Sequence, residues 1–412
     1  AIGDGRTHGL MRVLYVSRHS FPNDRVYSVQ IAHTCHALAK RGAEVSLYVS
    51  KMRRPSPAGC MEFFGLDLPD SLSIREVRNP PWVRRRRKLA KNVFIARMRL
   101  TCLTRFRKGP VFMYSRHEPV LASMPRKKGG PFLVFEAHEL KHLAVLERAR
   151  AWGRGPDDPK TQARLNRTRN LEARALRNVH GIACITHGLA REIAQTFNPT
   201  CPVHVIPSGV LTRHPRPVEK DIDVVYCGRL NPWKGVDTLI EAMRWLPGYR
   251  LTVVGGVDDR CLDRARALAA DLDVSGRIDF VGYVPYQEVW GYLDRARVAV
   301  LPTRGGEYAI ADRYTSPMKL LEYMMCGVPV VASDLAPIRE VLQDGVTAKL
   351  VTPNSPKALA AAMLALLKDE SLARQIAGRA REHALHYTWE NRAQKIIDLL
   401  NCAREKGSQE TI

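Results

Sequence analysis

The chain has 412 residues, which is too long for one ordinary core and suits two α/β domains of about 150 to 200 residues each. It is 45% hydrophobic and 25% charged, as globular proteins are, and no segment approaches the roughly 20 uninterrupted apolar residues that cross a bilayer. This excludes a protein built of membrane-spanning helices. The nine scattered cysteines include no C-x-x-C pair, which favours reduced thiols and a cytoplasmic location.

The net charge of +23 is distributed unevenly along the chain. Residues 1–210 contain 37 Lys and Arg against 15 Asp and Glu, whereas residues 211–412 contain 27 against 26. A strongly positive surface raises the local concentration of anionic partners. The first half is therefore expected to meet an anionic surface or polymer.

The sequence of the first half predicts a series of strands and helices. A short apolar run at 11–17 precedes a loop, an amphipathic stretch at 28–41 and a second strand at 44–49, which together predict a βαβ unit. Further strands are expected at 111–114, 131–135, 181–185 and 203–206. The pattern predicts a parallel, doubly wound domain over 1–207.

Residues 208–221 contain two prolines and mixed charges, which is typical of a linker between domains. A second series of strands and helices then predicts a C-terminal domain over 222–386, and 387–412 forms a final helical segment. The strands of this second series are expected at 223–226, 250–254, 278–281, 298–301, 329–332 and 349–351.

The strongest local signal is the strand, turn and helix at 224–235. The strand runs into Gly228, so Arg229 is expected at the carboxyl edge of the sheet, and Lys234 lies just before the next helix. A leaving nucleotide diphosphate needs fixed positive charge, because negative charge builds on it as the glycosidic bond breaks. Taken alone, this spacing also suits two solvated loop cations.

A second segment, 314–332, supports the interpretation that Arg229 and Lys234 belong to a binding site for a nucleotide diphosphate. Ser316 is a suitable N-cap and Pro317 a suitable first helical residue, so the helix can offer free N–H groups to a phosphate. Lys319 adds positive charge, and Glu322 lies nearly two turns further on, where it can accept hydrogen bonds from a ribose diol. The alternative is that Glu322 pairs with a neighbouring cation.

Together these motifs resemble those of the retaining glycosyltransferase family 4, the glycosyl transferases group 1. The likeness includes G-R-L-x-x-x-K-G at 228–235, S-P-x-K-x-x-E-Y at 316–323 and the strand that follows it, and extends to 206–210, 282–285 and 387–389. It implies an α/β GT-B fold, in which two Rossmann-like domains face a central cleft and the C-terminal helix crosses back to the N-terminal domain.

The resemblance also implies the roles of residues in the donor site. Arg229 and Lys234 would hold the diphosphate and act in catalysis, and Glu322 would bind the ribose. The other nucleotide-binding residues that it implies are Gly228, Ser316, Pro317, Met318, Lys319 and Leu320. We expect no metal or other cofactor, because these cations and the helix end would neutralise the diphosphate.

One position departs from the family's usual motif. That motif has two glutamates separated by seven residues, and the position eight before Glu322 is Tyr314. Relatives of the S-P-x-K-x-x-E-Y form share this departure, which leaves open how the sugar ring is held. Asp312 and Glu307 lie close enough in sequence to take the place of the missing glutamate.

In the N-terminal half, the segment from Phe135 to Glu139 is similar to the family's E-x-H-[DE] segment. This likeness implies that His138 is catalytic, donating a hydrogen bond to sugar hydroxyls or stabilising the oxocarbenium ion. The alternative is a structural histidine after a strand. The loop at 17–28 replaces the family's glycine-rich turn, and its candidate acceptor-binding residues are Asn23, Arg25, Tyr27 and Ser28.

A basic segment extends from 77 to 117 and contains thirteen Arg and Lys but no Asp or Glu. Its densest part is the run Arg84, Arg85, Arg86, Arg87 and Lys88. Apolar residues at 89, 93, 96, 100 and 103 recur at helical spacing. Such a helix can bind anionic lipid headgroups, or it can pack its apolar face on its own domain.

The favoured function is transfer of a sugar from a nucleotide sugar, UDP-linked by preference, to a glycan or glycolipid acceptor at the cytoplasmic face of the membrane. A GDP-mannose-dependent mannosyltransferase is the alternative within the same fold. Another GT-B enzyme, such as an epimerase or a phosphorylase, fits the motifs less well. From a different class, a basic protein that binds anionic polymers remains open, whereas no nucleic-acid-binding module is recognised.

Overall fold

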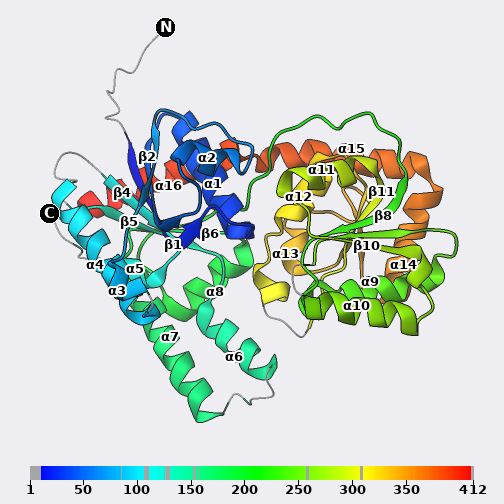
Figure 1. Ribbon diagram of the computed structural model, residues 1–412, viewed down its shortest axis with the longest axis horizontal. Coiled ribbons are helices and arrows are strands. Elements are labelled where there is room, and N and C mark those ends of the chain that lie inside the picture. The colour runs from blue at the N-terminus through cyan, green and yellow to red at the C-terminus, as the bar shows by residue number, and fades with distance from the viewer. Residues whose placement is uncertain are drawn as a thin grey trace, which may run out of the picture. The chain divides into compact units, whose positions relative to one another are not determined.

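The computed structural model describes residues 11–84, 86–105, 111–124, 126, 130–151, 155, 157–256, 259–306 and 310–409. Arg85 and Glu307 lie outside the described residues, as do the side chains of Arg84, Arg87 and Lys88. The chain divides into two compact units (Figure 1). Unit 1 comprises Ala1–Ile185, Leu189–Ile206 and Arg392–Ile412, and unit 2 comprises Thr186–Gly188 and Pro207–Asn391.

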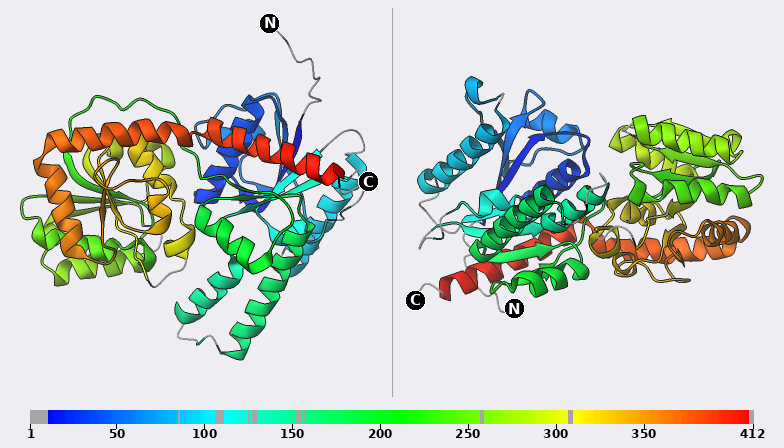
Figure 2. Two further views of the ribbon diagram at one scale, coloured as in Figure 1. Left: turned by 180° about the vertical axis from the view of Figure 1, so that it is seen from behind. Right: turned by 90° about the horizontal axis from the view of Figure 1, so that it is seen from below.

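Unit 1 is built on a seven-stranded parallel sheet of order β3-β2-β1-β4-β5-β6-β7. Helices lie along both faces of the sheet (Figures 1 and 2), so its inner strands are nearly continuous apolar runs rather than alternating ones. The strands are β1 (Arg12–Phe21), β2 (Glu44–Met52), β3 (Leu72–Glu76), β4 (Val111–Ser115), β5 (Phe132–Ala137), β6 (Gly181–Cys184) and β7 (Val203–Val205).

The helices of unit 1 include a hairpin of α6 and α7 that projects away from the sheet (Figure 1). The helices are α1 (Val26–Lys40), α2 (Pro57–Glu62), α3 (Pro81–Arg84), α4 (Arg87–Arg105), α5 (Glu118–Leu121), α6 (Lys141–Ala151), α7 (Pro159–Asn178), α8 (His187–Phe197) and the greater part of α16 (Trp389–Gln409).

The last helix, α16, packs on the sheet of unit 1 although it is far from it in sequence. A Cβ atom at Gly181, at the start of β6, would lie 3.1 Å from Leu399 and 3.3 Å from Ala403. Ala393, Ile396 and Leu399 belong to its fully buried stripe. A glycine in the strand therefore makes room for the helix.

Unit 2 repeats the architecture with a six-stranded parallel sheet of order β10-β9-β8-β11-β12-β13. Its strands are β8 (Ile222–Cys227), β9 (Leu251–Val254), β10 (Ile278–Gly282), β11 (Ala296–Leu301), β12 (Val330–Ser333) and β13 (Lys349–Val351). The strand order reverses between β8 and β11, and in open α/β sheets ligands bind beyond the strand ends at such a reversal.

The helices of unit 2 cover its sheet on both faces (Figure 2). Of these, α9 follows the predicted donor motif at 224–235, and α12 lies within the one at 314–332. They are α9 (Val236–Ala242), α10 (Asp259–Asp271), α11 (Tyr286–Arg295), α12 (Met318–Met325), α13 (Ala336–Arg339), α14 (Pro356–Lys368) and α15 (Glu370–Ala384). Among the described helices, none is long and apolar enough to cross a membrane.

The prediction that a loop begins at residue 17 is wrong, because β1 continues to Phe21. After an irregularity in the register, Ser20 and Phe21 still pair with Lys51 and Met52 of β2. Phe21 is 2% exposed and packs against Phe64, so its burial extends the strand. The loop before α1 is correspondingly short.

Among the glycines whose surroundings the structure describes, Gly235 makes the closest approach to another backbone segment. It follows the 3-10 helix η1 (Pro232–Lys234), has a φ of 69°, and a Cβ atom there would lie 1.8 Å from the carbonyl oxygen of Pro302. Only a residue without a side chain lets these two backbone segments meet. The close approach joins the turn after β8 to the turn after β11.

We therefore expect Gly235→Ala to lower the free energy of unfolding by more than about 3 kcal/mol, because backbone strain adds to a clash with backbone. Gly248→Ala is the matched control, since Gly248 also has a positive φ, of 85°, but nothing lies within 4 Å of its Cβ position. Gly248→Ala should lower the free energy of unfolding by only about 1 kcal/mol. Urea denaturation measures both, and equal losses would contradict the packing argument.

Candidate functional site

In unit 2, Lys319 on α12 lies directly against the turn that follows β8. Gly228 has a φ of 143°, and a Cβ atom there would lie 2.3 Å from the Nζ atom of Lys319. This Nζ atom donates a hydrogen bond to the hydroxyl of Tyr226 at 3.0 Å and lies 4.1 Å from the centre of its ring. The Tyr226 hydroxyl donates in turn to the carbonyl oxygen of Arg229 at 2.6 Å. Gly228 thus lets a cation reach the strand end.

Two lysines face this strand end with little compensating negative charge. Burial, together with the charge of Arg229, lowers the pKa of Lys234 to about 8. Burial lowers the pKa of Lys319 well below its usual value, and the charge of Lys234 lowers it further. Arg229 itself is exposed. The lowered pKa of each lysine means that its positive charge is destabilised here, and a bound anion would stabilise that charge.

Glu322 is the acid of this cluster. It lies on α12, is 7% exposed and accepts a hydrogen bond from the hydroxyl of Tyr286 at 2.9 Å. Burial raises the pKa of Glu322 to about 7, against the smaller lowering effects of Tyr286 and Lys319. The carboxyl group can therefore exchange a proton near neutral pH. Tyr286 was not predicted from the sequence.

The structure corrects the predicted start of α12. The helix begins at Met318 and its N-cap is Pro317, with no side-chain capping bond. Ser316 does not cap the helix, because its hydroxyl accepts a hydrogen bond from the N–H of Ser208 at 3.2 Å. Leu320 is fully buried and Met318 nearly so, which places both in the core behind the helix start.

Tyr314, which stands where the family has its first glutamate, is 1% exposed and lies in a short π-helix (Ile310–Tyr314). Of the two candidates to replace that glutamate, only Asp312 is described. Both carboxylate oxygens of Asp312 accept from the N–H of Gly306 at 3.0 Å. Asp312 thus fixes the loop after β11, and Glu307 lies outside the described residues.

The raised pKa of Glu322 makes a prediction for stability. The unfolded carboxyl group titrates near 4.5 and the folded one at about 7, so the contribution of this group to stability is greatest below pH 4.5 and falls as the pH rises to about 7. Glu322→Gln removes the buried charge. It should stabilise the protein by up to about 3 kcal/mol more at pH 8 than at pH 5.

Urea denaturation at the two pH values measures this difference. The matched control is Glu288→Gln, which changes an exposed glutamate in the first turn of α11. The control should alter stability little at either pH. An equal effect of Glu322→Gln at pH 5 and pH 8 would show that the buried carboxyl group does not titrate in this range.

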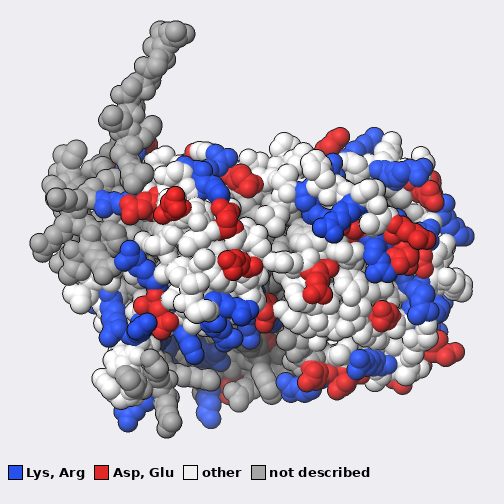
Figure 3. Space-filling model, turned by 45° about the horizontal axis from the view of Figure 1, so that its top comes forward, with Lys and Arg blue, Asp and Glu red and all other residues white. Residues whose placement is uncertain are grey.

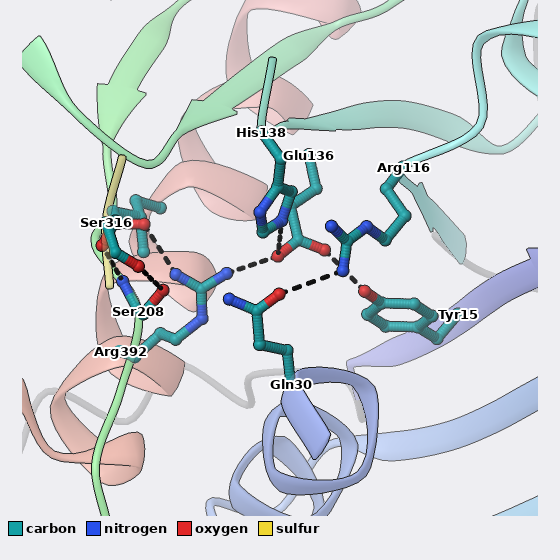
Figure 4. Close-up of polar contacts among 9 residues, drawn as sticks. Tyr15, Gln30, Arg116, Glu136, His138, Ser208, Ser316 and Arg392 are labelled. Carbon is teal, nitrogen blue, oxygen red and sulfur yellow. Dashed lines mark hydrogen bonds and ion pairs between the residues drawn. The ribbon is translucent and has the colours of Figure 1, made fainter. Parts of the chain in front are cut away.

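In unit 1, a polar cluster surrounds the carboxylate of Glu136 at the end of β5 (Figure 4). Glu136 is 1% exposed and accepts hydrogen bonds from the hydroxyl of Tyr15 at 2.5 Å and from Arg392. Arg392, 3% exposed, also donates to the carbonyl oxygen of Ile206 at 2.6 Å. The cluster thus ties α16 to the carboxyl edge of this sheet.

His138 lies at the edge of this cluster, where its Nε2 atom is 3.0 Å from Glu136. Burial and the charge of Arg116 lower the pKa of His138 to about 4. Burial would raise the pKa of Glu136, but His138, Arg392 and Arg116 together hold it below its usual value. The carboxylate can only accept, so Nε2 carries the proton and Nδ1 is an acceptor. The donation from His138 to a sugar stays a prediction, and in this tautomer the ring atom left to face a sugar is the acceptor Nδ1.

Most of the predicted acceptor residues contact one another or neighbouring residues between the end of β1 and the first turn of α1. The Ser28 hydroxyl, fully buried, accepts from the N–H of Asn23 at 3.1 Å, and the Asn23 side chain donates to the hydroxyl of Tyr27 at 3.2 Å. The ring of Tyr27 stacks on His19 with centroids 4.2 Å apart. Arg25 is exposed, so its side chain is the one open to solvent.

The basic segment forms α3 and α4, but its inward face differs from the predicted one. Phe94, Met98 and Cys102 are buried against unit 1, whereas Leu100 is 61% exposed. Trp82 on α3 is 69% exposed. One apolar face of α4 therefore packs on its own domain, as the alternative interpretation required, and a smaller set of apolar side chains remains in solvent.

The family model for glycosyl transferases group 1 matches residues 212–383, and the model for glycosyltransferase family 4 matches residues 28–214. The chain belongs to glycosyltransferase family 4. The predicted α/β GT-B fold, with two domains, is confirmed.

Curated relatives of this family-4 chain share moderate identity with it. A D-inositol 3-phosphate glycosyltransferase of Acidothermus cellulolyticus is 29% identical over 47% of this chain and 47% of its own length. A GDP-mannose-dependent α-(1-6)-phosphatidylinositol monomannoside mannosyltransferase of Mycolicibacterium smegmatis is 31% identical over 56% of this chain. The chain spans 65% of that relative, so the matches leave a good part of both proteins uncovered.

Among solved structures, sucrose-phosphate synthase from Thermosynechococcus elongatus superposes with a TM-score of 0.73 at 19% identity. The match covers 95% of this chain and 98% of the other. At this identity the likeness concerns the fold alone. It is consistent with the two sheets described above.

Proposed function

We propose that this family-4 chain is a nucleotide-sugar-dependent glycosyltransferase that retains the configuration of the transferred sugar. The observation that supports this most is the positive cluster at the strand reversal of unit 2. Lys234 and Lys319 are desolvated there beside Arg229, and Glu322 lies within the same cluster. A diphosphate would supply the negative charge that this cluster lacks.

In the proposed reaction, the bond from the anomeric carbon to the diphosphate oxygen breaks while the acceptor oxygen forms a bond on the same face of the sugar. The acceptor proton passes to an oxygen of the leaving diphosphate, so no separate general base is required. Arg229, Lys234 and Lys319 stabilise the charge that develops on the leaving group. The scheme requires no metal or other cofactor.

Glu322 is proposed to accept hydrogen bonds from the ribose of the donor. In the structure its carboxyl group is held by the Tyr286 hydroxyl, 2.9 Å away, so this side chain positions it. His138 is proposed to accept a hydrogen bond from the sugar through Nδ1, because Nε2 is engaged with Glu136. Asn23, Tyr27 and Ser28 shape the acceptor loop, and Arg25 presents its cation to the acceptor.

Two donors are candidates. A UDP-sugar is our preferred donor, following the frequency of such donors in the family. GDP-mannose is the second candidate, which the name of the Mycolicibacterium smegmatis relative favours. The names of both curated relatives mention inositol, in one as a phosphate and in the other as a lipid. These names favour a glycan or glycolipid acceptor that carries phosphate.

We further propose that the protein associates peripherally with the cytoplasmic face of the membrane through α3 and α4. Trp82 and Leu100 are exposed apolar side chains, and Arg86, Arg97 and Arg99 are exposed cations on the same two helices and the link between them. Lys and Arg side chains also gather on the lower part of unit 1 in the view of Figure 3. Each cation near an anionic surface contributes about 1 kcal/mol.

A thermal-shift screen of UDP, GDP and their sugars tests the donor site. We expect one nucleotide to raise Tm in the unaltered protein, and Lys234→Ala, Arg229→Ala and Glu322→Ala each to reduce turnover at least about 100-fold. Arg244→Ala, which changes an exposed cation on a neighbouring turn of unit 2, is the matched control. Full turnover in Lys234→Ala would refute the assignment, and stabilisation by no nucleotide would favour a polymer-binding protein.

Flotation with anionic vesicles tests the membrane contact. Changing all five residues from Arg84 through Lys88 to glutamine should weaken binding at least about 100-fold, because five positive charges are lost. The control replaces five exposed cations of the α7 hairpin, Lys160, Arg164, Arg167, Arg174 and Arg177. Equal losses in both variants would show that binding follows overall charge, and unchanged flotation of the first variant would refute the contact.

A further inference from the structure

Unit 1 contains a cavity of about 450 Å³ that the proposed function does not use. It lies where β2 and β3 end and α4 begins, and Arg18 of β1 reaches it from the neighbouring strand. The residues that line it are Arg18, Ser50, Lys51, Glu76, Asn79, Ala90, Lys91 and Phe94. This volume suits a small polar molecule.

Three cations from three different elements meet at the cavity. Arg18 comes from β1, Lys51 from β2 and Lys91 from α4. Arg18 and Lys91 are partly buried, and burial lowers the pKa of each. The charges of Arg18 and Lys141 lower the pKa of Lys91 further. Bringing these groups together costs free energy unless an anion offsets it.

The two acids near these cations, Glu76 and Glu118, interact with other groups. Glu76, which lines the cavity, accepts a hydrogen bond from the N–H of Met52 at 3.0 Å. Glu118, whose charge acts on both Arg18 and Lys91, forms its ion pair with Lys141. Within the part of the chain that the structure describes, the salt bridges do not include Arg18, Lys51 or Lys91. The cavity therefore carries a net positive charge.

We propose that this cavity binds a phosphate group of the acceptor. A phosphate has enough oxygens to accept from a guanidinium and two ammonium groups at once, and its charge offsets the repulsion among them. Ser50 and Asn79 offer polar walls to the molecule that bears the phosphate, and buried Phe94 offers an apolar one. The assignment to the acceptor rests on the proposed glycosyltransferase function.

Calorimetry with glycerol 3-phosphate and with inorganic phosphate tests the site directly. All titrations use full-length protein that carries Arg229→Ala and Lys234→Ala, so that phosphate bound at the proposed donor site does not contribute. We expect saturable binding, weakened at least about 10-fold by Arg18→Gln with Lys91→Gln, because each change removes charged hydrogen bonds to the anion. Glycerol should not bind.

The matched control is Arg164→Gln with Arg167→Gln, which removes the same charge from exposed positions on α7. This variant should bind phosphate as the parent protein does. Equal weakening in both variants would overturn the proposal, since binding would then follow net charge. Circular dichroism and urea denaturation verify the fold, and Lys51→Gln, at an exposed position, gives a milder variant that should weaken binding in the same direction.

Flotation distinguishes a lipid headgroup from a free phosphorylated molecule. Vesicles of phosphatidylcholine with phosphatidylglycerol are compared with phosphatidylcholine alone. If the lipid is the source, the cavity variant loses the preference for phosphatidylglycerol, whereas a free phosphate is indicated if only the calorimetric binding is lost. If neither free phosphate nor vesicle binding depends on Arg18 and Lys91, the proposal is overturned.

The same measurements separate this proposal from the proposed function. Calorimetry needs no nucleotide sugar, so loss of phosphate binding in the cavity variant would stand even if no sugar were transferred, and only the assignment to an acceptor would be overturned. If transfer does occur, the cavity variant should raise the acceptor KM at least about 10-fold and leave the donor KM unchanged. An unchanged acceptor KM would also overturn that assignment.

Discussion

In a parallel sheet that is buried on both faces, the carboxyl ends of all strands lie at one edge. This constraint determines where polar residues can gather in both units. In each sheet the order of strands reverses beside the first strand, β1 in unit 1 and β8 in unit 2. The turns on either side of a reversal diverge, so polar side chains can collect there without interrupting the core. Lys234 and Lys319 lie beside the reversal of unit 2, at the end of β8, whereas Glu136 lies at the end of β5, two strands from β1 in the sheet of unit 1.

The two units treat charge at this edge in opposite ways. In unit 1 the buried carboxylate of Glu136 is satisfied by Tyr15, His138 and Arg392, so the cluster is complete in itself and holds α16 in place. In unit 2, Lys234 and Lys319 repel each other and Glu322 is held by Tyr286. A closed network suits a structural role, whereas an unbalanced one suits an anionic ligand.

Much of the fold and part of the candidate site could be predicted because their signals are local. The apolar runs predicted the strands to within about four residues, except β3, which was missed, and the turn at Gly228 marked the end of β8. Ser316 was misassigned because its hydroxyl bonds Ser208, more than a hundred residues away. Arg392 was missed, although an arginine within the buried stripe between Trp389 and Ile396 is a signal that could have identified it.

The sequence by itself determined the two doubly wound units, the family and the identity of the residues at the strand ends, because short-range periodicity and motif spacing specify them. Only the tertiary structure decided which of those residues are desolvated and what each one contacts. Tyr286 reaches Glu322 and Lys319 reaches Gly228 because the sheet brings distant turns together. Protonation states near neutral pH follow from that packing, since burial and neighbouring charges set them.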